Sequence, residues 1–263
     1  MKRAIIMFLS LALSVSMLVG CGGSSQQVSN NPAQTKAQGV YVGTAQNTGG
    51  SNPYSEAIIL PDDRLYAVYG NIINNMFVID GFLVGQGTSN HGQYAVTDVR
   101  DYQWNGDLVH GSFSASYVPG QSISGTFKES GVSMPFTASV PPKATFVFDQ
   151  PALLTDLAQP WTSFIDLFGN YTTPTFESDG TVSGGILVHG TGTYCDYSGR
   201  LTPDSGGKNF FQVTVTFTSH PDVPRCSLEG QTAIGAAIVQ RNPAYLLLIV
   251  ETPNMGDFLM GSM

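Results

Sequence analysis

The residue types that most often perform acid–base or nucleophilic chemistry are few and widely spaced in this chain of 263 residues. None of the four histidines stands in an HxH or HExxH arrangement; they are His91, His110, His189 and His220. The chain has neither a GxSxG nucleophile elbow nor a DxDxDG calcium loop. The sequence therefore predicts neither a hydrolase nor a metal site.

Two pairs of residues have the spacing of a catalytic motif, but their sequence context does not support a catalytic role. Ser205 and Lys208 stand in SxxK spacing, but they belong to a Pro-Asp-Ser-Gly-Gly stretch that is typical of a hairpin turn. Asp98 and Asp101 are three residues apart, so in a regular strand their side chains point to opposite faces. We therefore expect a protein that is not an enzyme and that has no cofactor.

The cysteines have the most definite predicted chemistry. Cys195 and Cys226 enclose about 31 residues, and neither is accompanied by a CxxC pattern or a histidine pair, which argues against zinc. In an oxidising compartment we expect a disulfide, worth roughly 3–4 kcal/mol in the chain-entropy model. In a reducing compartment, two buried free thiols are the alternative.

Residues 1–20 have the organisation of a cleaved signal peptide. Lys2 and Arg3 precede an apolar run from Ala4 to Val19. This run of about 16 residues is shorter than the roughly 20 that a helix needs to span a bilayer, so a transmembrane anchor is the weaker interpretation.

The small residues before Cys21 resemble the lipobox of bacterial lipoproteins. That resemblance implies cleavage before Cys21, acylation of its thiol with a fatty acid such as palmitate, and attachment to a membrane through this lipid. Gly22 stands where an aspartate would resemble a signal for retention in the inner membrane. The expected location is therefore the outer membrane of a Gram-negative cell, and the leaflet that the protein faces is left open.

Residues 21–38 predict a lipidated, flexible tether. The segment 22–38, GGSSQQVSNNPAQTKAQ, has no aromatic residue and no carboxylate. A Gly/Ser-like coil of this length has an r.m.s. span of about 20–25 Å.

The charge of the chain excludes one class of partner. The net charge is −8, and removal of Lys2 and Arg3 with the leader makes it more negative still. The remaining Lys and Arg residues are dispersed along the sequence. Nucleic acid needs clustered cations, so we expect no nucleic-acid binding.

From Gly39 onward, short alternating apolar runs are separated by turn residues, a pattern typical of β-strands. About eight strands are expected in 39–140 and about eight in 145–263, with Pro141-Pro142 at the boundary and a short helix near 151–157. Asp80-Gly81 predicts either a tight turn or a bulge inside one longer strand.

An internal similarity supports two domains. GFLVGQGT at 81–88 is similar to GILVHGTGT at 185–193, about 104 residues later. Coincidence in a glycine-rich chain and a single large sandwich are the alternatives. Closure of each sheet would remove its exposed edges, so we predict an all-β protein of two small antiparallel up-and-down β-barrels in tandem.

Several segments resemble an uncharacterised family of proteobacterial lipoproteins with tandem small barrels akin to lipocalin-like and surface-lipoprotein barrels. They include GVYVGT (39–44), LPDDRLYAVYG (60–70), GTYCDYSGRLTP (192–203) and CSLEGQTAIGAAI (226–238). The resemblance covers nearly all of 39–263 and implies no catalytic residues. It departs near 158–164, where the family has a glycine-and-tyrosine opening strand and this chain has AQPWTSF.

Exposed aromatic side chains would suit contact with a protein or a glycan. The candidates are Tyr66, Tyr69 and Trp104, with Tyr66 and Tyr69 on opposite faces of one strand. Ordinary packing inside small barrels is the alternative for these residues.

The sequence is compatible with two functions. The first is a non-enzymatic binding or interaction module of the cell envelope, and the alternative is a carrier of a small apolar ligand in a barrel lumen. Bulky residues at alternating positions, such as Phe77, Ile79, Phe113 and Phe127, predict a filled core and favour the first function. A lumen of several hundred Å³ would favour the carrier.

Overall fold

The computed structural model describes residues 35–46, 53–73, 76–161, 163–166, 171–188, 193–220, 222, 225–242, 244–252 and 255–262. About 65% of this part is in β-strands, and its one helix, α1 (Leu154–Leu157), lies within the predicted stretch 151–157. No helix among these residues is long and apolar enough to cross a membrane. The leader, Cys21 and the tether up to residue 34 lie outside the described residues.

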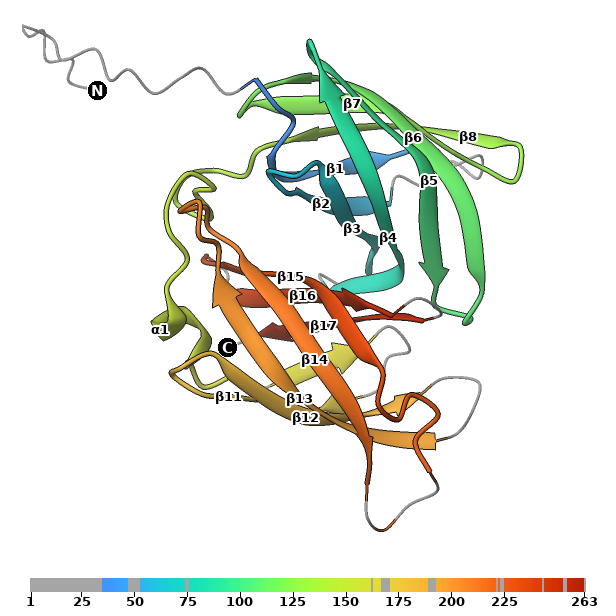
Figure 1. The fold of residues 1–263 in the computed structure, drawn as a ribbon. Coiled ribbons are helices and arrows are strands. Elements are labelled where there is room, and N and C mark those ends of the chain that lie inside the picture. The colour runs from blue at the N-terminus through green and yellow to red at the C-terminus, as the bar shows by residue number, and fades with distance from the viewer. Residues whose placement is uncertain are drawn as a thin grey trace, which may run out of the picture. The chain divides into compact units, whose positions relative to one another are not determined.

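The first eight strands close into the antiparallel up-and-down barrel that the sequence predicts (Figure 1). They are β1 (Gly39–Ala45), β2 (Tyr54–Ile59), β3 (Arg64–Ile73), β4 (Met76–Asn90), β5 (Gln93–Gln103), β6 (Leu108–Val118), β7 (Ser122–Glu129) and β8 (Val132–Ser139). Each strand pairs with the next, and β1 pairs with β8, with Thr44 opposite Thr137. Closure therefore joins the two ends of the sheet and removes its free edges.

Asp80 and Gly81 lie inside the long strand β4, so the bulge is confirmed and the tight turn is not formed. Tyr69 pairs with Gly81 and Gly70 pairs with Ile79, which leaves Asp80 as the extra residue. A Cβ atom at Gly81 would stand 2.6 Å from Cζ of Tyr69. Glycine is thus required here for the close approach of the tyrosine ring.

The second domain is a curled antiparallel sheet with the order β10-β9-β17-β16-β15-β14-β13-β12-β11 (Figure 1). Its strands are β9 (Ser163–Asp166), β10 (Tyr171–Thr172), β11 (Thr175–Phe176), β12 (Thr181–Val188), β13 (Thr193–Pro203), β14 (Phe211–Ser219), β15 (Thr232–Gln240), β16 (Tyr245–Glu251) and β17 (Gly256–Ser262). The protein therefore has two barrel-like domains in tandem, as predicted.

The second sheet does not close into a ring within the described residues, unlike the barrel predicted for it. Its edge strands β10 and β11 have two residues each, too few to seal the sheet along its length. Pro160 has no N–H to donate to a ladder, and β9 begins only at Ser163. The opening strand of this domain is therefore short.

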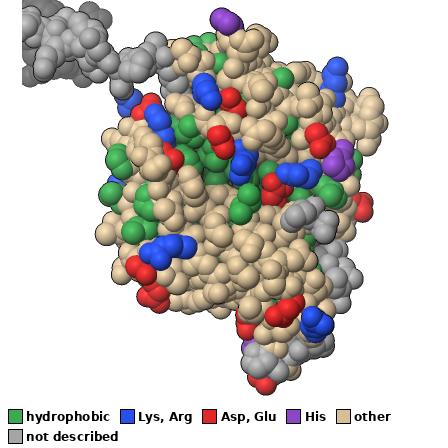
Figure 2. Space-filling model, viewed as in Figure 1, with side chains coloured by type: hydrophobic (Ala, Val, Ile, Leu, Met, Phe, Trp, Pro, Cys, Tyr) green, Lys and Arg blue, Asp and Glu red, His purple; other side chains and the backbone are tan. Residues whose placement is uncertain are grey.

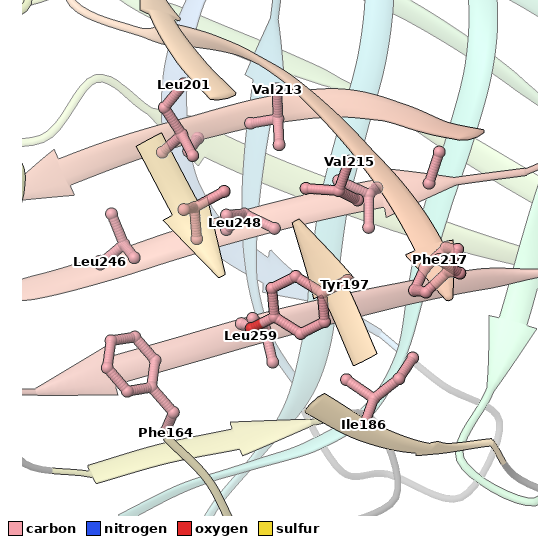
Figure 3. Packing of buried hydrophobic residues seen from close by; sticks show 14 of the residues in the cluster. Phe164, Ile186, Tyr197, Leu201, Val213, Val215, Phe217, Leu246, Leu248 and Leu259 are labelled. Atoms are coloured by element: carbon pink, nitrogen blue, oxygen red, sulfur yellow. The ribbon is translucent and has the colours of Figure 1, made fainter. Parts of the chain in front are cut away.

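Buried apolar side chains fill the concave side of the second sheet (Figure 3). Those that meet there include Ile186, Tyr197, Val215, Phe217, Leu248 and Leu259. The space left between them is about 20 Å³, no more than one water molecule would need. The interior of this domain is therefore filled by side chains.

The predicted disulfide is present in the second domain. Cys195, on β13, is bonded to Cys226, and their Cα atoms are 4.9 Å apart. Cys226 lies in the connection between β14 and β15, so the bond ties a strand to a loop rather than two strands. Both residues are buried, which shields the bond from solvent.

Candidate functional site

The lumen of the first barrel contains a cavity of about 380 Å³. Most of its wall is apolar, and Tyr41, Leu83, Phe113 and Phe127 contribute to it. Phe113 and Phe127 thus face the interior as predicted, but they leave it unfilled. The prediction of a filled core is therefore wrong for the first barrel.

Small side chains at inward positions explain the space. Ala57 on β2 and Ala67 on β3 are paired directly across the two strands, and both line the cavity. Ala138 on β8 also lines it. An eight-stranded barrel has an interior that side chains can just fill, so alanines at these positions leave room for a ligand.

The other two residues cited for a filled core lie elsewhere. Phe77 and Ile79, on β4, are partly buried and pack against an apolar cluster that includes Phe82, Tyr66 and Leu247. Their bulk therefore does not occupy the lumen.

One end of the barrel is covered by the chain that leads into it. The hydroxyl of Tyr41 donates to the carbonyl of Ala37 at 2.9 Å, and the hydroxyl of Tyr117 donates to the carbonyl of Thr35 at 2.6 Å. Ala37 is fully buried, and its N–H donates to Oγ of Ser89 at 3.0 Å. The segment from Thr35 to Ala37 therefore packs against this end.

Polar side chains gather toward the opposite end. Strands of an up-and-down barrel alternate in direction, so the β3–β4, β5–β6 and β7–β8 connections share one end. Gln103 is the last residue of β5 and Glu129 the last of β7, and both line the cavity. Asn71, Asp80 and Asp101 line it as well. The cavity thus combines an apolar wall with a polar, acidic end.

Asp101 is the centre of this polar group and is 2% exposed. The hydroxyl of Tyr69 donates to both of its carboxylate oxygens, at 2.9 and 3.0 Å. Nε2 of Gln103 lies 3.2 Å from Oδ2 of Asp101 and 3.2 Å from Oε1 of Glu129. A single amide therefore bridges two carboxyl groups.

The pKa of Asp101 is raised from 3.8 to about 7, mainly by burial and also by the neighbouring Glu129 carboxyl, while the hydrogen bonds from Tyr69 and Gln103 oppose the shift. Glu129 raises this pKa through a hydrogen bond to the protonated Asp101 carboxyl, so near neutral pH the Asp101 proton can lie between the two groups. Asp80 accepts a hydrogen bond from Nδ2 of Asn71 at 2.6 Å, and burial raises its pKa as well.

The three candidate aromatic residues do not form one surface. Tyr66 is fully buried, and its hydroxyl oxygen accepts a hydrogen bond from Nη1 of Arg64 at 3.4 Å. Tyr69 lines the lumen, so the two tyrosines point to opposite faces as predicted. Trp104, in the β5–β6 turn, is 61% exposed. Of the three, only Trp104 is placed to meet a macromolecular partner.

The other groups considered for catalysis or metal binding make only simple pairs. Nδ1 of His110 lies 2.7 Å from Oδ1 of Asp98 on the exposed surface. Nζ of Lys208 pairs with Oδ1 of Asp149 at 2.7 Å. Within the described residues no three His, Cys, Asp or Glu side chains are grouped so as to hold a metal ion.

Sequence reasoning missed the acidic end of the lumen. It placed Asp98 and Asp101 on opposite faces correctly, but it did not connect Asp101 with Glu129, which stands 28 residues later. The two residues could have been connected by their positions in the predicted strands. Both carboxyls lie at inward positions close to hairpins, and these hairpins share one end of an up-and-down barrel.

Comparisons with known proteins give no match: no protein family, no curated protein and no solved structure is significantly similar to the chain. The resemblance to tandem-barrel lipoproteins therefore stays a prediction. Function must be argued from the cavity and its lining.

Proposed function

We propose that the first barrel binds a small, largely apolar molecule in its lumen and that the protein carries this molecule. The observation behind the proposal is the contrast between the two domains, with about 380 Å³ left in one and about 20 Å³ in the other. Pockets that hold small molecules start at roughly 300 Å³, and an apolar wall with a few polar groups is their usual composition.

Burial of the ligand against the apolar wall of the cavity supplies most of the binding free energy. Transfer of apolar surface from water contributes about 25 cal/mol for each Å², so 100 Å² of ligand surface would contribute about 2.5 kcal/mol. The covered end near Ala37 and Tyr41 would act as a floor, and the acidic end would face the polar part of the ligand.

The leader supports a location for this carrier. We propose that the chain is cut before Cys21, lipidated there and held at the outer membrane, with the tether separating the barrels from the lipid surface. On the face seen in Figure 2, Lys and Arg side chains are interspersed with Asp and Glu and form no continuous basic patch. This distribution accords with a carrier that does not bind nucleic acid.

The lumen can be tested by filling it. Ala67→Phe places a phenyl ring in the cavity, whereas Ala95→Phe adds the same ring at an exposed position on β5. We expect a neutral fluorescent apolar probe to bind the mature chain, to bind the Ala67→Phe variant about tenfold more weakly or worse, and to be unaffected by Ala95→Phe. Thermal unfolding of both variants checks that each is folded.

Two results would contradict the carrier. One is the absence of saturable binding by any of a panel of neutral apolar probes. The other is equal binding by the two folded phenylalanine variants, because the probe would then sit outside the lumen.

A second candidate, an interaction module of the envelope, rests on apolar side chains exposed in two hairpins. Ile72, Ile73 and Val78 belong to the β3–β4 hairpin. Trp104 lies in the β5–β6 turn and Leu108 begins β6. If these residues bind a protein, Trp104→Ser should abolish its recovery from envelope extracts. Val118→Ser, an exposed change at the other end of β6, should not.

A further inference from the structure

The carboxyl groups of the cavity lack a compensating charge. Asp80, Asp101 and Glu129 line it, and no Lys, Arg or His is among its lining residues. None of the three carboxyls takes part in an ion pair within the described part of the chain, although six other acidic residues pair with Lys or Arg. The acidic end of the lumen therefore has an unbalanced negative potential whenever these groups are ionised.

One oxygen of this group also lacks a hydrogen-bond donor. Oε1 of Glu129 accepts from Gln103, but Oε2 is buried and receives no hydrogen bond from any described residue. A buried acceptor without a donor costs about 1–3 kcal/mol, and more when it is charged. Either a proton shared with Asp101 or a donor on a ligand would satisfy it.

A metal ion is a poor candidate for this role. Calcium takes six to eight oxygen ligands, and the described residues hold no group of three acidic or other metal-binding side chains with suitable geometry. An organic cation needs fewer contacts. An ammonium group presents three donors, and aromatic rings such as that of Tyr69 attract cations across their faces.

We propose that the ligand of the first barrel is a small amphiphile with a cationic amine head, and that this head binds between Asp101 and Glu129. The inference rests on the proposed binding in the lumen and adds the chemical class of the ligand. The apolar body lies against the wall near Phe113 and Phe127. The ammonium group donates to Oε2 of Glu129 and to the carboxylate of Asp101, in place of the shared proton.

Three probes of equal chain length test the head group: octylamine, octanol and octanoate. They compete with the neutral fluorescent probe for the mature chain without its lipid, residues 22–263, which includes every described residue. We expect octylamine to bind about tenfold or more tightly than octanoate, with octanol between them, because only the amine matches the charge of the site.

Isosteric variants locate the head group. Asp101→Asn and Glu129→Gln should each weaken octylamine by about five- to tenfold or more and leave octanol within about twofold. Asp98→Asn is the matched control, since it removes the same charge from the exposed face of the same strand. It should change neither ligand by more than about twofold.

The outcomes separate this inference from the carrier itself. If octanoate binds as tightly as octylamine while octanol still competes, the cationic head is wrong and the lumen site stands. If octylamine is preferred but neither Asp101→Asn nor Glu129→Gln weakens it, the head group does not bind between these residues. If none of the three amphiphiles competes and no neutral probe binds, the carrier proposal fails as well.

Discussion

The hydroxyl of Tyr69 donates to both carboxylate oxygens of Asp101, at 2.9 and 3.0 Å, inside the lumen of the first barrel. Tyr69 reaches this position because the bulge at Asp80 sets Gly81 opposite it. Asp101 in turn is linked through Gln103 to Glu129. The bulge in β4 thus helps to position a hydrogen-bonded cluster of side chains from three strands, β3, β5 and β7.

Loss of the Tyr69 hydroxyl should destabilise the protein most when Asp101 is ionised. Tyr69→Phe removes the donor of two hydrogen bonds to a buried carboxylate, so we expect a loss of about 1–3 kcal/mol in the free energy of unfolding at pH 8. The loss should be smaller at pH 5, where Asp101 is protonated. Urea denaturation at the two pH values measures the difference.

Tyr66→Phe is the control for this change, because it lies on the same strand but on the opposite face. The Tyr66 hydroxyl receives only a long contact of 3.4 Å from Arg64, so we expect a loss below about 1 kcal/mol. Equal losses in the two variants, without pH dependence, would contradict the role given to Tyr69.

Stability should fall as pH rises from about 4 to about 7. Burial raises the pKa of Asp101 from 3.8 to about 7, so in this range the folded chain keeps a proton that the unfolded chain releases. The buried Glu56 carboxyl, hydrogen-bonded by Gln240 and Tyr245, has a pKa raised from 4.5 to about 7 by burial and acts in the same direction. Each group contributes at most roughly 1.4 kcal/mol per pH unit.

The double variant Asp101→Asn/Glu56→Gln should flatten this profile, which urea denaturation at intervals of half a pH unit would record. At about pH 8 and above both groups are mostly ionised in the folded and the unfolded chain, so the wild-type profile should level off there. A double variant whose profile has the same slope as the wild type between pH 4 and 7 would show that neither carboxyl is held protonated by the fold.

The positions of most strands along the chain could be predicted, because strand formation depends largely on the types of residues that are adjacent in sequence. Alternating apolar residues and turn residues predicted the closed first barrel and the two-domain order. Closure of the second sheet was not predictable in the same way, since it depends on how far the short strand β9 and its edge partners extend. Those lengths are set by contacts between residues distant in sequence.

The cavity could not be predicted from bulky residues alone. Its volume is the difference between the interior of an eight-stranded barrel and the side chains that enter it, so Ala57 and Ala67 matter as much as Phe113. Sequence reasoning considered the large inward residues and overlooked the small ones. The pairing of the two alanines across β2 and β3 appears only once the register is known.

Gly81→Ala should disturb the lumen through Tyr69. The added Cβ would stand 2.6 Å from Cζ of Tyr69, so the ring must move away from Asp101, and we expect a loss of about 1–3 kcal/mol. At Gly206 the nearest atom to an added Cβ is an oxygen of the Asp204 side chain at 2.9 Å, which can rotate away. Gly206→Ala should therefore change stability by less than about 0.5 kcal/mol in the same thermal or urea unfolding assay.

Lipidation should depend on the thiol of Cys21. We expect mass spectrometry of the exported protein to find an N-terminal peptide that begins at Cys21 and carries acyl chains, because the leader and the small residues before it match a lipoprotein signal. Cys21→Ser should leave the chain unacylated and release it from the membrane fraction. An unmodified Cys21, or a leader that is not removed, would refute the anchor.

Reduction of the disulfide should destabilise the second domain. The Cys195–Cys226 bond closes a loop with a sequence separation of 31, which corresponds to roughly 3–4 kcal/mol if the constraint acts on the unfolded chain. We expect dithiothreitol to lower the unfolding midpoint of the wild type and not that of the double variant Cys195→Ala/Cys226→Ala. Under conditions where the reduced protein remains folded, probe binding in the first barrel should be unchanged, because the bond lies wholly in the other domain. Two reactive thiols in native protein taken from the periplasm would show that the bond does not form there.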